Sequence, residues 1–337
     1  MEVFVMGITI KELSELSGYS PATISRVIAN KGNVKKDTKE AIEKLLIEHD
    51  YRTNIMELRT SELKRKTIMI IVGDLDNTYY TELIKIIKND ALERGYTTLI
   101  AFSDNSIEEE EHFVKMAIKE RYAGIVFINV RGGSDLAEML IQSEIPVIFL
   151  NRGIRFYDFN SVTSDNYEGG YMITSYLIRR GHKKIGHFMG PSYSTAAQER
   201  CRGYEDAMTD KGLSVTNNSI FSGELSWSGG YECGERMVKK GLDYTAVFCG
   251  NYSMAMGLVD ALRDYGVKIP EDISVVCYDD TLFTEKYGLT IVGAEVDKLG
   301  RKAIDLLVSN IEGKTADGGS VVYKPKIIER NSVKRVN

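Results

Sequence analysis

The chain has 337 residues, of which 43% are hydrophobic and 27% are charged, and its formal net charge at pH 7 is −5. A chain of this length and composition forms about two or three globular domains, which excludes a disordered chain, a collagen-like fibre and a disulfide-stapled miniprotein. No apolar run approaches the ~18 residues that a membrane-spanning helix needs.

The first 66 residues carry the only basic excess, with 12 Lys and Arg against 10 Asp and Glu, whereas the remainder carries 31 against 38. In this segment Thr9 and Glu12 form a capping-box pattern, which predicts the start of a helix that Gly18 ends. Ser20 followed by Pro21 predicts the N-cap and first residue of a second helix. A second capping-box pattern, Asp37–Glu40, predicts the start of a third helix.

Three short helices with a glycine turn between the first two are typical of a helix-turn-helix. The outer face of the second helix, which could enter a DNA major groove, is predicted to carry Pro21, Ala22, Ser25 and Arg26. Arg26 can bond a guanine through two hydrogen bonds, and the hydroxyls of Ser20, Thr23 and Ser25 suit phosphate oxygens. A small helical bundle with a structural role is the alternative.

The strings Gly18-Tyr19-Ser20 and Thr23-Ile24-Ser25-Arg26-Val27, followed by Asn30, make residues 8–51 closely resemble the headpiece of the LacI/GalR family of bacterial transcription regulators. This resemblance implies a DNA-binding headpiece over residues 7–51 and a hinge over 52–66. The implied DNA-binding residues are Thr9, Ser20, Pro21, Ala22, Thr23, Ser25, Arg26, Asn30 and Asn54. The hinge departs from the family pattern at Thr53, Glu57 and Thr60, which puts its folding on DNA in question.

From Thr67 onward, short apolar runs alternate with helical segments such as Tyr80–Arg94 and Ile107–Glu120. This alternation predicts right-handed βαβ units in doubly wound parallel sheets, and the number of units suits two sheets better than one. The predicted buried strands are Ile68–Val72, Thr98–Phe102, Gly124–Ile128, Val147–Leu150, Ile185–Met189, Ala246–Cys249 and Ile273–Cys277.

The motifs Gly181–Ile185, Met189-Gly190-Pro191 and Asp272–Asp280 resemble, in order and spacing, the periplasmic-binding-protein-like (type I) body of the same family. The fold class implied is an all-α headpiece plus an α/β body of two Rossmann-like subdomains. The effector-binding domain would span 67–337, with one subdomain at about 67–164 and 294–323 and the other at about 165–293 and 324–337.

Ligands of open α/β sheets bind at the carboxyl ends of the strands. Tyr79, Tyr80, Asn129, Asn151, Asn251 and Asp279 follow such ends, and Arg200 lies early in a helix. Aromatic faces with amide, carboxylate and guanidinium groups suit a polyhydroxylated ligand. By resemblance, Arg200, Asn251 and Asp279 occupy the principal effector positions, Leu225 stands where many members carry an aromatic ring, and Trp227 lies two residues on.

Structural roles are the alternative for several of these residues. Tyr79 and Tyr80 could simply pack in the core, and Arg200 and Asp279 could form a structural ion pair. Tyr252 replaces a common aspartate, and Asn151 stands where Asp is frequent, so both change the expected pocket.

Catalytic signatures are missing from the sequence. Gly313-Lys314-Thr315 lacks the upstream glycine of a phosphate loop, and the histidines and cysteines show no metal-ligand spacing. The four cysteines, far apart in the chain, are expected to be buried reduced thiols of a cytoplasmic protein. We therefore expect neither an enzyme nor a metal site nor a cofactor.

The sequence as a whole predicts a homodimeric transcriptional regulator, a repressor, which binds a pseudo-palindromic double-stranded operator. A small-molecule effector between the subdomains, most simply a sugar, would control this binding. Two alternatives stay open. Segments 165–170 and 246–250 resemble the purine-responsive branch of the family, which favours a nucleobase effector, and a sugar-binding solute receptor would use the same body.

Overall fold

The computed structural model describes residues 8–28, 34–49, 51, 63–75, 77–154, 156–216, 218–314 and 319–336. The chain divides into two compact units, Met1–Thr67 and Ile68–Asn337, and each is considered by itself. Among the described residues, none of the helices combines the length and apolarity needed to cross a membrane.

The first unit contains helices α1 (Ile10–Ser17), α2 (Pro21–Ile28) and α3 (Lys36–Glu48). The predicted capping box is confirmed: the Glu12 amide donates to Thr9 Oγ1 at 3.3 Å, and the Thr9 amide donates to Glu12 Oε2 at 2.7 Å. Gly18 ends α1 with a left-handed φ of 72°. The three helices enclose a small core of Leu13, Ile24, Val27 and Ile42.

The predicted start of the third helix is wrong by two residues. Helix α3 already includes Lys36, so Asp37 lies in its first turn rather than at the N-cap. A carboxylate in the first turn still interacts favourably with the positive end of the helix dipole, which explains why the pattern resembled a cap.

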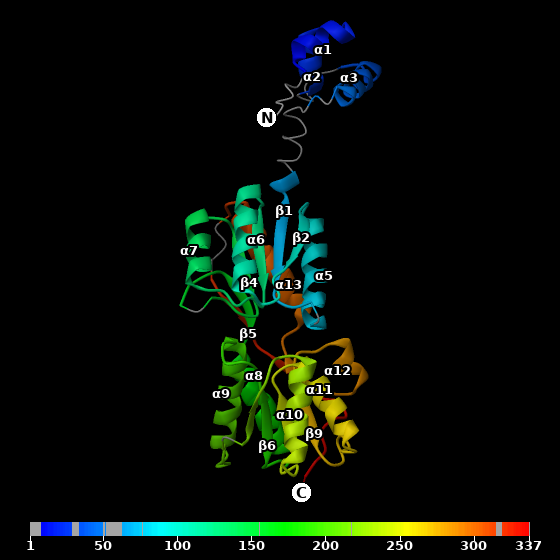
Figure 1. Ribbon diagram of the computed structural model, residues 1–337. Coiled ribbons are helices and arrows are strands. Elements are labelled where there is room, and N and C mark those ends of the chain that lie inside the picture. Colours follow the sequence, from blue (N-terminus) through cyan, green and yellow to red (C-terminus); the bar gives the residue numbers. More distant parts are fainter. Residues whose placement is uncertain are drawn as a thin grey trace, which may run out of the picture. The chain divides into compact units, whose positions relative to one another are not determined.

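The second unit holds two six-stranded sheets (Figure 1). The first sheet has the order β11-β5-β4-β3-β1-β2, and its paired strands are parallel. Its strands are β1 (Thr67–Val72), β2 (Thr97–Phe102), β3 (Gly124–Ile128), β4 (Val147–Leu150), β5 (Ser161–Ser164) and β11 (Val321–Tyr323).

The second sheet has the order β12-β10-β9-β8-β6-β7, and only the β10–β12 pair is antiparallel among the described pairs. Its strands are β6 (Ile185–Met189), β7 (Ile220–Ser222), β8 (Ala246–Cys249), β9 (Ser274–Tyr278), β10 (Thr290–Gly293) and β12 (Lys326–Ile328). The chain passes between the sheets after β5, after β10 and after β11.

Helices cover both faces of each sheet. Helices α5 (Thr78–Glu93) and α13 (Val296–Ile311) pack together on the first sheet, with α6 (Ile107–Glu120) and α7 (Ser134–Ser143) as the other pair. On the second sheet the pairs are α8 (Asn166–Arg179) with α9 (Thr195–Thr209), and α10 (Trp227–Lys239) with α11 (Tyr252–Asp264). The short helix α12 is Leu282–Lys286.

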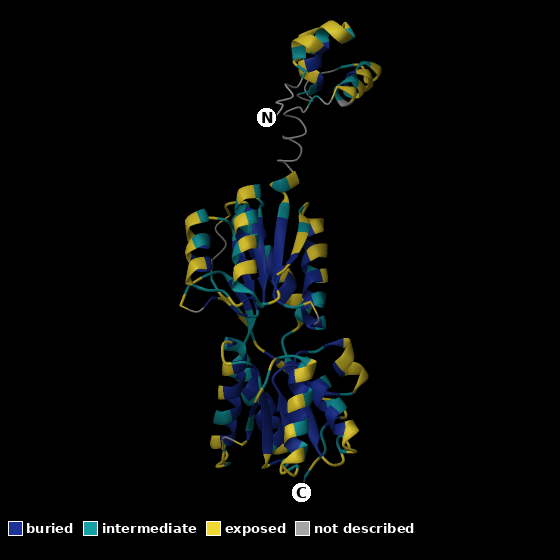
Figure 2. Cartoon of the chain, in the orientation of Figure 1, coloured by how far each residue is buried: buried dark blue, intermediate teal, exposed yellow. Residues whose placement is uncertain are grey.

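The strands are buried because both of their faces are covered, as Figure 2 shows for the interior of each sheet. All five residues of β3 and of β9 are buried, for example. Parallel strands that are covered on both faces read in the sequence as unbroken apolar runs. The predicted fold class, a helical headpiece plus a two-sheet α/β body, is confirmed.

Candidate functional site

Helix α2 presents the face that the sequence predicted. Ile24 and Val27 are buried, whereas Pro21, Ala22, Ser25 and Arg26 are exposed. The Ser20 hydroxyl accepts from the Thr23 amide at 3.2 Å and lies 2.9 Å from the Thr23 hydroxyl, so it caps the helix. The cap and the buried residues hold the helix in place. Its exposed side therefore presents small side chains around the one guanidinium of Arg26.

The remaining residues predicted to contact DNA are placed only in part. Thr9 is exposed at the start of α1, where its hydroxyl and amide both contact Glu12. Asn30 and Asn54 lie outside the described residues, and so do the hinge positions Thr53, Glu57 and Thr60.

A cavity of about 270 Å³ lies between the carboxyl ends of the two sheets. Residues that follow β1, β2, β3 and β4 contribute one side, and residues that follow β6 and β7 contribute the other. Its lining residues are Asp74, Asn77, Tyr80, Asp104, Asn105, Asn129, Arg152, Pro191, Tyr193, Ser194, Glu224, Leu225 and Ser226. The arrangement offers amides, carboxylates, a guanidinium and phenol rings to a small polar ligand.

Of the predicted effector residues, the structure brings Tyr80, Asn129 and Leu225 to this cavity. The sequence interpretation missed Arg152, Tyr193 and Glu224. The strand-end rule that selected Tyr80 and Asn129 also applies to Arg152 and Tyr193, which follow β4 and β6. Leu225 was named by resemblance, and its neighbour Glu224 follows β7, a strand that the sequence did not predict.

Arg200 reaches towards the second sheet rather than into the cavity. Its Nε donates to Asn166 Oδ1 at 2.8 Å, one Nη donates to the Gly250 carbonyl, and its Cζ lies 3.5 Å from the centre of the Tyr278 ring. Helices α8 and α9 approach so closely here that a Cβ on Gly170 would stand 2.2 Å from the Arg200 carbonyl oxygen, so only glycine fits at this position. This close packing sets the position of the guanidinium.

Asp279 and Asn251 also have partners within the protein. Asp279 Oδ1 lies 4.0 Å from Arg200 Nη2. Burial raises the pKa of Asp279 while the nearby Arg200 charge lowers it. Asn251 caps α11 by accepting from the Met254 amide at 2.9 Å, and its side-chain amide donates to the Leu225 carbonyl at 3.0 Å. Asn251 therefore holds the loop around Leu225 against the start of α11.

The other predicted effector residues are Tyr79, Asn151 and Trp227. Tyr79 is buried beside Tyr80, and burial, followed by the Asp279 charge, raises its pKa well above the usual value. Asn151 follows β4 with a left-handed φ of 68°, which aims the next residue, Arg152, at the cavity. The structure does not bring Trp227 to the cavity, because its ring is 47% exposed and its Nε1 donates to Asp260 at 2.8 Å.

Tyr252 joins the two halves of the body. This residue begins α11 in the second sheet's layer, and its hydroxyl oxygen accepts from the Thr78 amide at 2.6 Å and from the Thr78 hydroxyl at 2.8 Å. Thr78 begins α5 beside the first sheet. The tyrosine that replaces the expected aspartate thus bridges the two subdomains directly.

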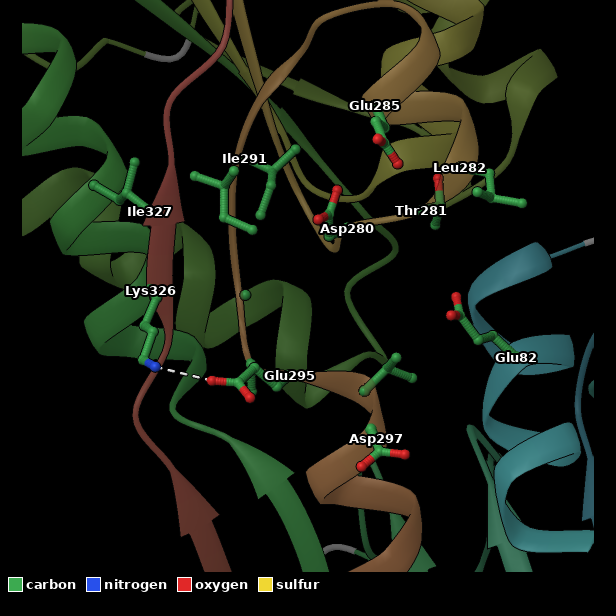
Figure 3. A pocket seen from close by; sticks show the side chains of 14 residues that line it. Glu82, Asp280, Thr281, Leu282, Glu285, Ile291, Glu295, Asp297, Lys326 and Ile327 are labelled. Atoms are coloured by element: carbon green, nitrogen blue, oxygen red, sulfur yellow. Dashed lines mark hydrogen bonds and ion pairs between the residues drawn. The ribbon is translucent and has the colours of Figure 1, made fainter. Parts of the chain in front are cut away.

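A larger cavity, about 510 Å³, lies where the chain crosses between the sheets (Figure 3). Several of its carboxylates already have cationic partners: Glu295 contacts Lys326 at 2.8 Å, and Asp280 contacts Arg330 at 2.8 Å. No predicted effector residue lines it. We regard the smaller cavity as the candidate ligand site because, of these two cavities, it is the one that gathers the carboxyl ends of strands from both sheets.

Thiols and metals add no further chemistry in the described part of the chain. All four cysteines are buried and unpaired, as expected, and burial raises the pKa of Cys201 to about 12. No group of His, Cys, Asp or Glu side chains with a metal-binding arrangement occurs among the described residues.

Two family matches cover most of the chain. Residues 9–54 match the bacterial regulatory proteins of the lacI family, and residues 174–333 match the periplasmic binding protein-like domain. The first match covers the three helices of the first unit, and the second covers nearly all of the second sheet.

Relatives match over nearly the whole length. The HTH-type transcriptional repressor PurR of Haemophilus influenzae is 30% identical, over 97% of this chain and 99% of its own. Among solved structures, a complex of the transcriptional regulator CelR with cellobiose is 25% identical, with a TM-score of 0.73 over 96% of this chain and 99% of its own. The transcription regulator CcpA of Lactococcus lactis is 27% identical, with a TM-score of 0.75 over 80% of this chain and 99% of its own.

Proposed function

The chain belongs to the LacI family of bacterial regulatory proteins and is a DNA-binding transcriptional repressor, and on this basis we propose that a sugar-like ligand in the cavity between its two sheets controls its affinity for operator DNA. The observation that carries the proposal is the cavity itself. Its 270 Å³ are close to the lower end of the ~300–1,000 Å³ of typical ligand pockets, which suits a ligand of about monosaccharide size.

The lining supports a hydroxylated ligand. Carboxylate and amide side chains such as Asp104, Asn105 and Asn129 can pair with several hydroxyl groups, and Tyr80 supplies a ring edge. The CelR structure with cellobiose provides a sugar-binding precedent on the same fold.

In the mechanism that we infer, two equilibria are linked. Ligand that binds between the subdomains changes their relative position, and this change alters how the DNA-reading helices α2 meet the operator. A coupling of ~1–3 kcal/mol, or about 5–150-fold in affinity, is typical for such linkage.

A homodimer fits the apolar surface of the body. Edge strand β2 exposes Leu99, Ile100 and Phe102, and α12 exposes Leu282 and Phe283; both elements lie on the right in Figure 1. An apolar edge strand tends to pair with another chain unless it is covered. A second copy would cover it and would supply the second α2 for a pseudo-palindromic site.

A nucleobase is the second candidate effector. Several relatives that match over nearly the whole length are named PurR, and segments 165–170 and 246–250 resemble the purine-responsive branch of the family. The cavity offers a purine few flat apolar faces, because Tyr193 already lies against two arginines. The sugar therefore remains our first choice.

Selection of a binding site from random DNA duplexes by the full-length chain tests the regulatory function. We expect a palindromic consensus, whose binding changes when a ligand found in a thermal-shift screen of sugars and purine bases is added. A chain that prefers no palindrome over random duplex, with or without these ligands, would refute the proposal. Purine bases acting where sugars do not would select the second candidate.

A further inference from the structure

Arg152 is a buried cation in the cavity wall, and none of the described acidic residues forms an ion pair with it. Only 6% of the residue is exposed. Its one hydrogen bond to a described residue runs from Nη2 to the Asn129 carbonyl oxygen at 3.3 Å, and its buried Nε has no partner there. No carboxylate of the described residues lies within 4.0 Å. Because a buried charge is costly unless it is paired, this guanidinium is prepared for a partner that the described residues do not supply.

The neighbouring groups meet this need only in part. Glu110 is fully buried near the same loop, and its charge favours the charged form of Arg152, but the two side chains form no ion pair. The carboxylate oxygens of Glu110 instead accept the amides of Arg131 and Gly132, each at 2.8 Å. Arg131 adds a second positive charge, and the Cζ atoms of Arg131 and Arg152 lie 4.8 and 5.7 Å from the centre of the Tyr193 ring. Burial lowers the pKa of the Arg152 guanidinium, which reflects the same unfavourable environment.

The acidic residues of the cavity lie in a different environment. Asp104 and Glu224 are exposed and Asp74 is half-buried, so water and salt screen their charges more than they screen the charge of Arg152. An anion that enters at the buried end of the cavity therefore gains more from Arg152 than it loses to the exposed carboxylates. The same carboxylates can accept hydroxyl groups from the rest of the ligand.

We propose that the ligand carries an anionic group, a carboxylate or a phosphate, that pairs with Arg152, and hydroxyl groups that face the polar rim. The ligand class is then a small sugar acid or sugar phosphate rather than a neutral sugar. This inference rests on the proposed function, since it assumes that the effector occupies this cavity, and it adds the charge of the ligand and the residue that selects it.

Calorimetry on the full-length chain with matched ligands tests the inference. The probes are glucose, glucuronate and glucose 6-phosphate, then ribose and ribose 5-phosphate, with inorganic phosphate as the minimal anion. We expect at least one anionic probe to bind about tenfold or more tightly than its neutral counterpart, as a charge-assisted bidentate contact would give. The glucuronate and phosphate members of the panel distinguish a carboxylate from a phosphate.

Variants assign the preference to Arg152. Arg152→Gln should remove the preference for the anion, whereas Arg152→Lys, which keeps the charge but not the paired donors, should retain part of it. Arg202→Gln is the control, because Arg202 is an exposed arginine that lies over the Tyr167 ring. If Arg152→Gln fails to fold, the Lys variant and the salt dependence of wild-type binding still decide the question.

Three results would overturn the inference. If a neutral sugar binds as tightly as its anionic counterpart and alters operator binding, the ligand needs no anionic group, and the proposed function stays intact. An anion preference that survives unchanged in Arg152→Gln would assign it to another residue. Binding by purine bases alone would contradict both the sugar effector and its charge.

Discussion

Burial is the largest influence on the protonation of His187, a residue of strand β6 in the second sheet. Its ring is fully buried between Tyr204 and Phe248, with centroid distances of 5.1 and 4.6 Å. Nδ1 lies 3.0 Å from the Phe248 carbonyl oxygen, so it carries the proton of the neutral ring, and Nε2 has no partner among the described residues. Burial lowers the pKa of His187 to about 4 from the ordinary value of 6.5.

This lowered pKa makes the stability of the body depend on pH. The unfolded chain takes up the proton below pH 6.5, whereas the folded chain resists it until about pH 4. The stabilisation is therefore complete above pH 6.5 and is lost as the pH falls towards 4, by up to about 3 kcal/mol. We expect His187→Phe to flatten this part of the profile in urea unfolding between pH 4.5 and 7.5. His112→Gln, at an exposed site, should leave the slope unchanged, and an equal slope in wild type and His187→Phe would contradict the assignment.

Single residues of the ligand cavity were predictable only where local position decides. Asn129 follows the end of a predicted strand, whereas Leu225 was named by resemblance. Arg152 and Tyr193, which were missed, follow β4 and β6 by two and four residues, so the same rule applies to them. The orientation of Arg200 was not predictable, because it depends on partners from the α8 segment and from Gly250, which lies 50 residues away. Tertiary contacts of this kind leave no local pattern in the sequence.

At the scale of elements, α2 is the one whose exposed face can be tested most directly. We expect Arg26→Ala to weaken operator binding by ~1–3 kcal/mol and to relax the preference at one base pair, because a bidentate contact to a base edge would be lost. Quantitative footprinting on the selected site and on its single-base variants measures both effects.

Lys44→Ala on α3 removes an equal charge from an exposed position of the same unit. It should leave the base preference intact, and it separates base reading from general attraction to DNA. A preference that is unchanged in Arg26→Ala would rule out the base contact.

Strands with a clear apolar pattern in the sequence were predicted, whereas strands with a weak pattern were not. The apolar runs gave β1, β3, β4, β6 and β8 to within a residue, since strands covered on both faces need an unbroken apolar sequence. Strands β7, β11 and β12 have three residues each, which is too short for any periodicity. Their positions in the sheets depend on the crossing segments and on the strands beside them.

At the scale of the whole molecule, the exposed apolar residues of α12 make the dimer testable. Leu282 is 81% exposed, although it begins a capped helix. Leu282→Asp should leave the fold intact, because an acid suits the first turn of a helix, yet it should weaken self-association by about 10- to 100-fold.

Sedimentation equilibrium measures the dissociation constant of this dimer. Ile141→Asp on α7, where the side chain is 57% exposed, is the matched control and should dimerise normally. A wild-type chain that remains monomeric at micromolar concentration would refute the homodimer.

The bridge between Tyr252 and Thr78 should set how firmly the two subdomains hold together. The tyrosine oxygen accepts two hydrogen bonds across the body, and burial raises its pKa, so it stays protonated and neutral. Tyr252→Phe removes the acceptor of both bonds and leaves the Thr78 amide without its partner. Each lost bond costs ~0.5–1.5 kcal/mol, so a ligand that binds the closed cleft should bind about 5- to 150-fold more weakly.

Calorimetry with the ligand identified in the screen measures this loss, and operator titrations show how much coupling goes with it. Tyr265→Phe is the matched control, because Tyr265 lies at the other end of α11 and its hydroxyl contacts Glu235 on the surface. Thr78→Val, which removes the hydroxyl but keeps the amide, should cause about half of the effect if the two bonds contribute similarly. Equal ligand affinity in Tyr252→Phe and Tyr265→Phe would mean that the bridge has no part in closure.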